Sequence, residues 1–392
     1  MDFQNREKEK QTWNVGMDTK CQGMDLNIQD QYHAISFPIY QTATFSHRHL
    51  GESQGFDYTR QSNPTRQQLE SIVALLENGN HALAFASGMA AISAVLELFQ
   101  PGDHILIDED LYGGSVRLFE EIGKKNGLRF SSLNCSEDDL ESFLEPSTKA
   151  VYFETPTNPM MRVTDIRALA EKARKHQVLV IVDNTFLSPY FQNPLDLGAD
   201  IVIHSGTKYL SGHHDTIGGF VVVNDEGLNQ KLRRISTTIG SAMAPFDSWL
   251  MIRGIRTLGV RVKQAEKNAL AIARYLQTNP HVVRTIYPGL PDHPGYSVMK
   301  KQARGFGSMI SFEVDTPETA KTILNNTELF YFAESLGGTE TLITYPLTQT
   351  HADVPKEILE KNGITDRLLR LSVGIEDKED LIAEFERIFA LA

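Results

Sequence analysis

Two continuous apolar runs, VLVIVD (178–183) and DIVIHS (200–205), constrain the fold of this chain most strongly. Their apolar residues do not alternate with polar ones, which indicates strands buried on both faces, as in a mostly parallel sheet covered by helices. Similar runs, several of them separated by amphipathic helical segments, indicate five more strands. They are HALAFAS (81–87), HILID (104–108), LRFSSLN (128–134), AVYFET (150–155) and GGFVVV (218–223). The sequence therefore predicts an α/β domain built on a seven-stranded, mostly parallel sheet with helices on both faces.

The rest of the chain is expected to form an arm and a second domain. Residues 1–60 are polar and lack clear periodicity, which is typical of an arm that contacts a neighbouring subunit. Residues 61–250 would hold the large sheet. Residues 251–392 contain apolar runs such as MISFEV (309–314) between helical stretches and would form a smaller α+β domain. Apolar residues at helical spacing over 244–277 predict one long helix that links the two domains.

Composition narrows the class of function. The net charge of -12 would repel phosphate backbones and anionic lipid, so neither nucleic acid nor membrane is an expected partner. Cys21 and Cys135 are the 2 cysteines and form no CxxC pair, which implies neither a disulfide framework nor a cysteine-rich metal site. The polar N-terminus lacks the apolar core of a secretory signal. We therefore expect a cytoplasmic protein that works on a small molecule.

Ligands of open α/β sheets bind beyond the carboxyl ends of the strands, so the residues that follow each apolar run are candidates for a site. Gly88 and Met89 follow the first run and open a helix, whose free N–H groups could hold a phosphate; tight packing explains such a turn equally well. Tyr112 follows the second run and could lay its ring on a planar ligand. Asn158 lies in a proline-fixed loop after the fourth run. Loop tyrosines and turn-forming asparagines are common, so neither residue is decisive alone.

The fifth and sixth runs end in more specific chemistry. Asp183 ends the fifth run, and Lys208 follows the sixth between the hydroxyls of Ser205 and Thr207. A lysine with a reference pKa near ~10.4 must be desolvated or lie near other positive charge to act as a nucleophile. These groups together could hold pyridoxal 5'-phosphate (PLP): the helix N-terminus would bind its phosphate and the tyrosine ring would stack on it. The lysine would form a Schiff base with PLP, and the strand-end carboxylate would pair with its pyridine nitrogen. A nucleotide-binding α/β protein is disfavoured because the Walker and Rossmann glycine motifs are missing.

Eight motifs then occur in order along the chain. They are YTRQSNPT (58–65), FASGMAA (85–91), LYGG (111–114), ETPTNP (154–159), VDNTF (182–186), HSGTKYLSGH (204–213), AESLGG (333–338) and RLSVGIE (370–376). In this order the chain resembles the trans-sulfuration, or Cys/Met-metabolism, family of PLP enzymes from about residue 33 to its end. The resemblance implies the fold-type I, aspartate-aminotransferase-like architecture.

The resemblance also implies roles for the residues that would hold the cofactor. Lys208 would be the Schiff-base lysine and the base that moves protons, Asp183 would pair with the pyridine nitrogen, and Tyr112 would stack on the ring as a second catalytic group. The phosphate would be held by the backbone of Gly88 and Met89 and by the hydroxyls of Ser205 and Thr207.

The resemblance further implies which residues contact the substrate or a second subunit. Tyr58 and Arg60 would reach the phosphate of a neighbouring subunit, which implies a homotetramer built as a dimer of dimers with shared sites. Arg370 would clamp the substrate carboxylate in a bidentate way, helped by Asn158 and Ser335.

The expected reaction is elimination or replacement at Cβ or Cγ of a sulfur amino acid or an activated homoserine. Glu334 favours enzymes that act on the γ side of cystathionine or on O-acylhomoserine, and we expect it to meet an ammonium group because an unpaired buried carboxylate is costly. A β-lyase is the alternative. Methionine γ-lyase is disfavoured by Gly114, where that enzyme usually has cysteine, and O-acylhomoserine sulfhydrylase is a further, weaker alternative. A catalytically silent PLP-binding protein is disfavoured by the intact set of residues. His214 stands where relatives often have serine, and with His213 and Asp215 it gives no convincing metal-ligand pattern.

Overall fold

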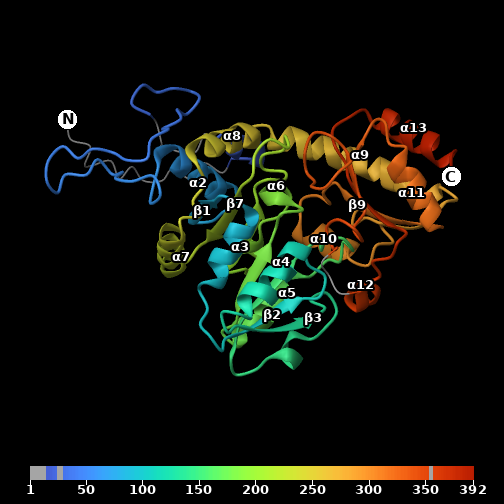
Figure 1. Cartoon of the computed structure of the whole chain (residues 1–392), viewed down its shortest axis with the longest axis horizontal. Helices are drawn as coiled ribbons and strands as arrows, with labels where there is room; N and C mark the ends of the chain where they lie inside the picture. The colour runs from blue at the N-terminus through green and yellow to red at the C-terminus, as the bar shows by residue number, and fades with distance from the viewer. Residues whose placement is uncertain (1–14, 24–29, 353–355) are drawn as a thin grey trace.

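The computed structural model describes residues 15–23, 30–352 and 356–392. Figure 1 shows three regions along the long axis: extended N-terminal segments at one end, a large sheet with its helices in the middle, and a second sheet with the C-terminus at the other end. The arm residues in the described part form α1 (Met17–Lys20) and an isolated bridge between Thr44 and Tyr58.

The central sheet has seven strands in the order β1-β7-β6-β5-β4-β2-β3. β7 runs antiparallel to its neighbours β1 and β6, whereas β3, β2, β4, β5 and β6 pair in parallel. The prediction of a seven-stranded, mostly parallel sheet is confirmed. Its strands are β1 (His81–Phe85), β2 (His104–Asp108), β3 (Arg129–Leu133), β4 (Thr148–Glu154), β5 (Leu179–Asp183), β6 (Ile201–Ser205) and β7 (Gly219–Val223).

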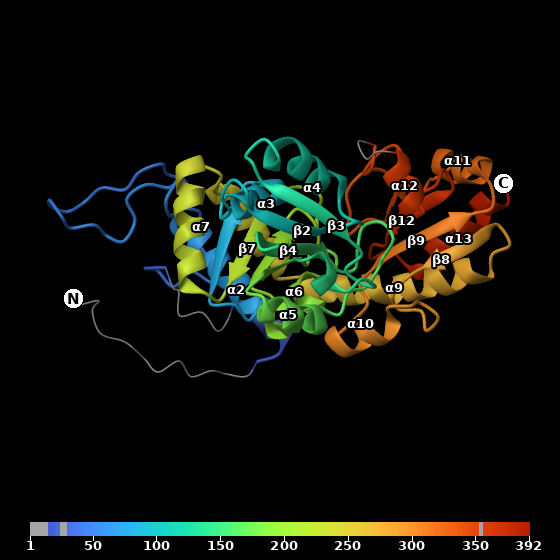
Figure 2. The same cartoon turned by 90° about the horizontal axis from the view of Figure 1, so that it is seen from below.

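Helices cover both faces of this sheet, as Figure 2 shows. Along β5, Val180 and Val182 pack into one apolar core and Ile181 into the other, which is why the run shows no polar alternation. The first core includes α2 (Pro64–Leu76), α5 (Ile166–Lys175) and α6 (Ser188–Phe191), and the second includes α3 (Gly88–Leu96) and α7 (Glu226–Ile239). Shorter helical turns are α4 (Gly113–Arg117), Leu118–Gly123, Leu140–Phe143 and Pro194–Leu197.

The predicted long helix over 244–277 is wrong in one respect, because two helices occupy this region. α8 (Pro245–Ile255) and α9 (Leu258–Thr278) are separated at Arg256 and Thr257. The carbonyl of Gly254 accepts from the Arg261 guanidinium at 2.8 Å and from Thr257 Oγ1 at 3.1 Å. These side-chain bonds satisfy the carbonyl at the break, so the helix can end there and restart at little cost.

The C-terminal region contains a five-stranded sheet in the order β10-β11-β12-β9-β8 with its own apolar core. The apolar run MISFEV (309–314), predicted in this region, forms β9. The strands are β8 (Val282–Ile286), β9 (Met309–Val314), β10 (Tyr331–Phe332), β11 (Leu342–Thr344) and β12 (Leu368–Ser372). The helices are α10 (Tyr296–Gln302), α11 (Pro317–Asn325), α12 (Lys356–Asn362) and α13 (Lys378–Phe389). The predicted boundaries between the arm, the large domain and the smaller domain, at residues 60 and 250, stay a prediction.

Candidate active site

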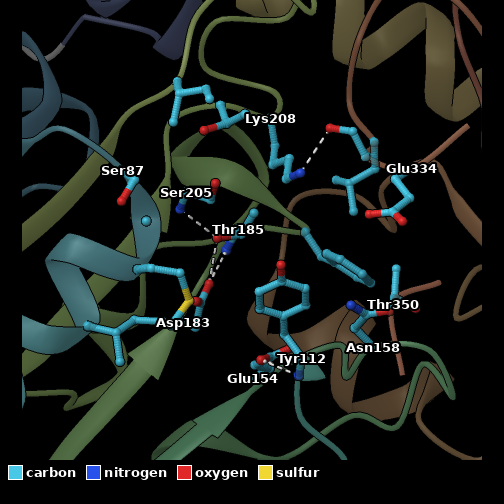
Figure 3. A pocket seen from close by; sticks show the side chains of 18 of the residues that line it. Ser87, Tyr112, Glu154, Asn158, Asp183, Thr185, Ser205, Lys208, Glu334 and Thr350 are labelled. Atoms are coloured by element: carbon cyan, nitrogen blue, oxygen red, sulfur yellow. Dashed lines mark hydrogen bonds between the residues drawn. The ribbon is translucent and has the colours of Figure 1, made fainter. Parts of the chain in front are cut away.

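A cavity lies beyond the carboxyl ends of the central strands and is closed on one side by residues of the C-terminal region (Figure 3). It brings together all the predicted site residues except Tyr58 and Arg60. Those that line it are Gly88, Met89, Tyr112, Asn158, Asp183, Ser205, Thr207, Lys208, Glu334, Ser335 and Arg370.

Lys208 extends into this cavity from the loop that follows β6. Its Nζ donates to Ser335 Oγ at 2.9 Å. Burial, together with the positive charge of Arg370, lowers the pKa of Lys208 to about 8, and the charge of Glu334 opposes this shift. The amine is thus desolvated and near another cation, which are the conditions that make a lysine nucleophilic near neutral pH.

Asp183 ends β5 at the floor of the cavity. Its Oδ1 accepts from the Thr185 N–H at 3.0 Å and from Thr185 Oγ1 at 2.5 Å. Burial raises the pKa of Asp183, and the two bonds from Thr185 oppose that rise. Thr185 Oγ1 also accepts from the Ser205 N–H at 2.8 Å, so it ties the ends of β5 and β6 together.

The N-terminus of α3 faces the cavity in a form suited to an anion. Ser87 Oγ caps the helix by accepting from the Ala90 N–H at 3.0 Å. The N–H groups of Gly88 and Met89 belong to the first turn and have no acceptor within the helix. A Cβ at Gly88 would lie 3.0 Å from Ser205 Cβ, so glycine permits the close approach of helix and strand end.

The two side-chain hydroxyls predicted to bind the phosphate, those of Ser205 and Thr207, differ in their surroundings. Thr207 Oγ1 accepts from the Gly218 N–H at 3.1 Å and donates to the Gly218 carbonyl at 3.2 Å. It would have to give up the second bond to donate to an anion. Ser205 lines the cavity with no such competing bond from its hydroxyl among the described residues. The helix terminus, the close approach at Gly88 and the Ser205 hydroxyl therefore fit the phosphate of PLP.

Tyr112 lies at the opposite wall, where its ring is partly exposed in the cavity. Its N–H donates to Glu154 Oε1 at 2.9 Å. A Cβ at Gly114 would lie 2.4 Å from Tyr112 Cε1, so a cysteine at this position would force the tyrosine ring to move.

Arg370 lies in β12 and reaches the cavity almost fully buried, with 1% of its surface exposed. Its Nη1 donates to Asn158 Oδ1 at 2.8 Å, and its Nη2 donates to the Ser335 carbonyl at 3.1 Å and to Thr344 Oγ1 at 3.2 Å. Its Nε has no acceptor among the described residues. Burial lowers the pKa of Arg370 to about 10, so the group stays charged at neutral pH. A buried guanidinium with a free donor and no carboxylate partner in the described chain fits a substrate carboxylate.

Glu334 lies at the rim and lines both this cavity and an adjoining one that includes His214 and Phe332. Its side chain is exposed. The expectation that an unpaired carboxylate would be costly here is wrong, because water solvates the group. If Glu334 contributes to binding, it would do so by electrostatic attraction of a substrate ammonium group at the mouth of the cavity.

Tyr58 and Arg60 lie away from this cavity and line a separate hollow with Arg66 and Gly240. The Arg60 guanidinium lies over the Tyr58 ring, 5.5 Å from its centroid. The chain does not bring them to its own site, and their expected role at a neighbouring subunit stays a prediction.

Sequence reasoning missed several residues of the cavity, among them Glu154, Thr185 and Thr350. Glu154 ends β4 as Asp183 ends β5, so the same strand-end argument could have found it. Thr350 comes from a distant loop of the C-terminal region and has no such signal. In the described part of the chain, no group of three or more His, Cys, Asp or Glu residues could hold a metal ion.

Comparisons with known proteins agree with this geometry. Residues 18–390 match the family described as Cys/Met metabolism PLP-dependent enzyme. Cystathionine gamma-lyase of Bacillus subtilis (strain 168) is 47% identical and covers 90% of this chain and 93% of its own length. Cystathionine beta-lyase of Lactococcus lactis subsp. cremoris (strain MG1363) is 46% identical with the same coverage. Cystathionine gamma-synthase/O-acetylhomoserine (thiol)-lyase of B. subtilis is 48% identical and covers 93% of this chain and 94% of its own length.

A solved structure gives the same result for the fold. The crystal structure of cystathionine gamma-lyase from Lactobacillus plantarum complexed with L-serine superposes with a TM-score of 0.93 at 44% identity, covering 96% of this chain and 99% of that one. This likeness confirms the predicted fold-type I architecture. The chain belongs to the Cys/Met-metabolism family of PLP-dependent enzymes.

Proposed function

We propose that the chain is a carbon–sulfur lyase or transferase of the cystathionine γ-lyase or γ-synthase type, acting on L-cystathionine or an O-acylhomoserine. One observation carries the proposal: Lys208, Asp183 and Arg370 line one cavity that has Glu334 at its rim. The relatives named γ-lyase, β-lyase and γ-synthase are similar to this chain to nearly the same degree, so they support the reaction class and leave cystathionine β-lyase as the alternative.

Bound PLP would supply an electron sink for negative charge at the substrate Cα. Asp183, with Thr185 as its donor, would face the ring nitrogen, and Tyr112 would cover the ring. The N–H groups of Gly88 and Met89 would bind the phosphate. The position of these residues along one cavity supports these assignments.

The substrate carboxylate would bind the free donor side of Arg370, which Asn158 and Ser335 hold in place. Lys208, once displaced by the substrate amine, would take the proton from Cα. Reaction at Cγ needs a second proton to leave, from Cβ, and Lys208 would take this proton as well. General acid–base catalysis of this kind contributes ~10² to 10⁴-fold.

Glu334 is the residue on which the γ preference depends. An exposed carboxylate at the cavity mouth would attract the ammonium of the distal half of cystathionine, or of incoming cysteine. Such an attraction across solvent is modest, ~1 kcal/mol or less. We therefore expect it to alter the ratio of products more than the total rate.

The test is to incubate the enzyme with L-cystathionine and separate the keto acids. We expect 2-oxobutyrate with cysteine to predominate; pyruvate with homocysteine would make the enzyme a β-lyase. Glu334→Gln should reduce γ products more than β products. Glu328→Gln is a matched control, because Glu328 lines the adjoining cavity but not the cavity that contains Lys208. This variant should leave the ratio of γ to β products unchanged. Equal loss of both products in Glu334→Gln would show that Glu334 does not determine the γ preference.

The active unit is proposed to be a homotetramer in which Tyr58 and Arg60 serve a neighbouring site. Arm residues with apolar side chains support this, since Tyr32 is 82% and Ile35 95% exposed in the single chain. In the described part of the chain no helix is long and apolar enough to cross a membrane. A cytoplasmic location is part of this proposal.

A further inference from the structure

Glu154 is a buried carboxyl in the cavity that has no role in the proposed reaction. It ends β4, keeps 6% of its surface exposed, and lies in register with Asp183 at the end of β5. Neighbouring strands are ~4.8 Å apart, so the two acidic side chains stand beside each other at one edge of the sheet. Two ionised carboxylates this close repel each other, and such a pair commonly shares one proton.

Hydrogen bonds decide which of the two carries the charge. Asp183 accepts two bonds from Thr185 and a longer one from the Tyr152 hydroxyl at 3.5 Å. Glu154 accepts one bond, from the Tyr112 N–H. Burial, followed by the charge of Asp183, raises the pKa of Glu154 well above its usual range. The better-solvated carboxylate is therefore Asp183, and the proton belongs on Glu154.

The bond to Tyr112 connects Glu154 to the wall of the cavity. Tyr112 immediately precedes α4, and its carbonyl accepts from the N–H groups of Ser115 and Val116 in the first turn of that helix. Tyr112 as a residue is 40% exposed. Figure 3 shows Glu154 beside the base of Tyr112, joined to its backbone by the 2.9 Å bond. This bond ties the backbone that carries the Tyr112 ring to the end of β4.

We propose that Glu154 is a positioning residue that holds Tyr112 over the PLP site through the Tyr112 N–H and stands uncharged beside Asp183. Asp183 is then the one carboxylate of the pair that faces the ring nitrogen. This inference rests on the proposed function for the roles of Tyr112 and Asp183.

Two substitutions separate the parts of this role. Glu154→Gln keeps a neutral acceptor for the Tyr112 N–H, and Glu154→Met keeps the volume but has no oxygen acceptor. Binding of PLP to the cofactor-free protein should be within about threefold of wild type in Glu154→Gln. It should be about tenfold weaker in Glu154→Met, because the Tyr112 N–H loses its partner. Hydrogen exchange of the segment around Tyr112 should quicken in Glu154→Met alone.

A measurement on the wild-type protein checks the charge state even if Glu154→Met does not fold. Infrared difference spectra of wild type against Glu154→Gln should contain the carbonyl band of a protonated carboxyl group. Absence of that band, a Glu154→Gln protein as impaired as Glu154→Met, or a folded Glu154→Met protein that matches wild type would each overturn the inference. A wild-type protein that binds no PLP would instead overturn the proposed function.

Discussion

Replacing Arg370 by lysine tests the carboxylate clamp while keeping a positive charge in place. The guanidinium spends three donor contacts on Asn158, Ser335 and Thr344 and keeps a free Nε in a fully buried setting. A lysine ammonium is a point donor that cannot make a bidentate contact. Burial would also lower the pKa of the new lysine from ~10.4, so part of it would lose its charge near neutral pH.

The size of the effect follows from the bonds lost. A hydrogen bond to a charged group contributes ~1.5–3 kcal/mol, and lysine would lose one of the two bonds to the substrate carboxylate. A loss of ~2–3 kcal/mol corresponds to a fall in kcat/KM of roughly 30- to 150-fold. PLP binding should change little, because Arg370 is not expected to contact the cofactor.

Steady-state kinetics would measure this with L-cystathionine and with an analogue whose reacting half lacks the α-carboxylate. We expect the loss with cystathionine and nearly equal rates for wild type and Arg370→Lys with the analogue. Arg367→Lys is the matched control, since Arg367 lies three residues earlier and pairs with Glu313 at 2.6 Å. Equal losses on both substrates would show that Arg370 does not act through the substrate carboxylate and would refute the clamp.

Three further predictions concern the lysine, the cavity wall and the arm. Because burial lowers the pKa of Lys208 to about 8, attachment of PLP to the cofactor-free protein should speed up as pH rises through about 8 and then level off, as followed by stopped-flow absorbance; a rate independent of pH would contradict this. Gly113→Ala should lower the free energy of unfolding by ~1–3 kcal/mol in denaturant titrations, because its Cβ would lie 2.4 Å from the Thr350 carbonyl oxygen, whereas Gly16→Ala, with open space around it, should have no effect. Mixed oligomers of Arg60→Ala and Lys208→Ala chains should regain part of the activity, and no recovery in verified mixed oligomers would argue against shared sites.

The central sheet could be predicted because its strands carry their own signal. The runs at 178–183 and 200–205 are buried on both faces, and such burial requires consecutive apolar residues that can be recognised in the sequence. The break between α8 and α9 carries no such signal. At the break the Arg261 side chain donates to the Gly254 carbonyl, a contact that apolar spacing does not encode, and apolar spacing continues across it.

The site divides in the same way. Asp183 and Lys208 follow strands, so parallel pairing alone brings them to one edge. Thr350 and the exposure of Glu334 depend on how the C-terminal region packs against that edge, which local patterns do not encode. The sequence also suggested Thr207 as an anion donor, without showing that Gly218 already engages its hydroxyl.

Reduction of the PLP-loaded protein with borohydride, followed by peptide mass spectrometry, tests the central claim most directly. Borohydride fixes the cofactor to the amine that holds it. We expect one PLP-modified peptide, with the modification on Lys208, and no labelling of a Lys208→Ala protein. A modification on another lysine, or a wild-type protein that takes up no PLP, would contradict the account.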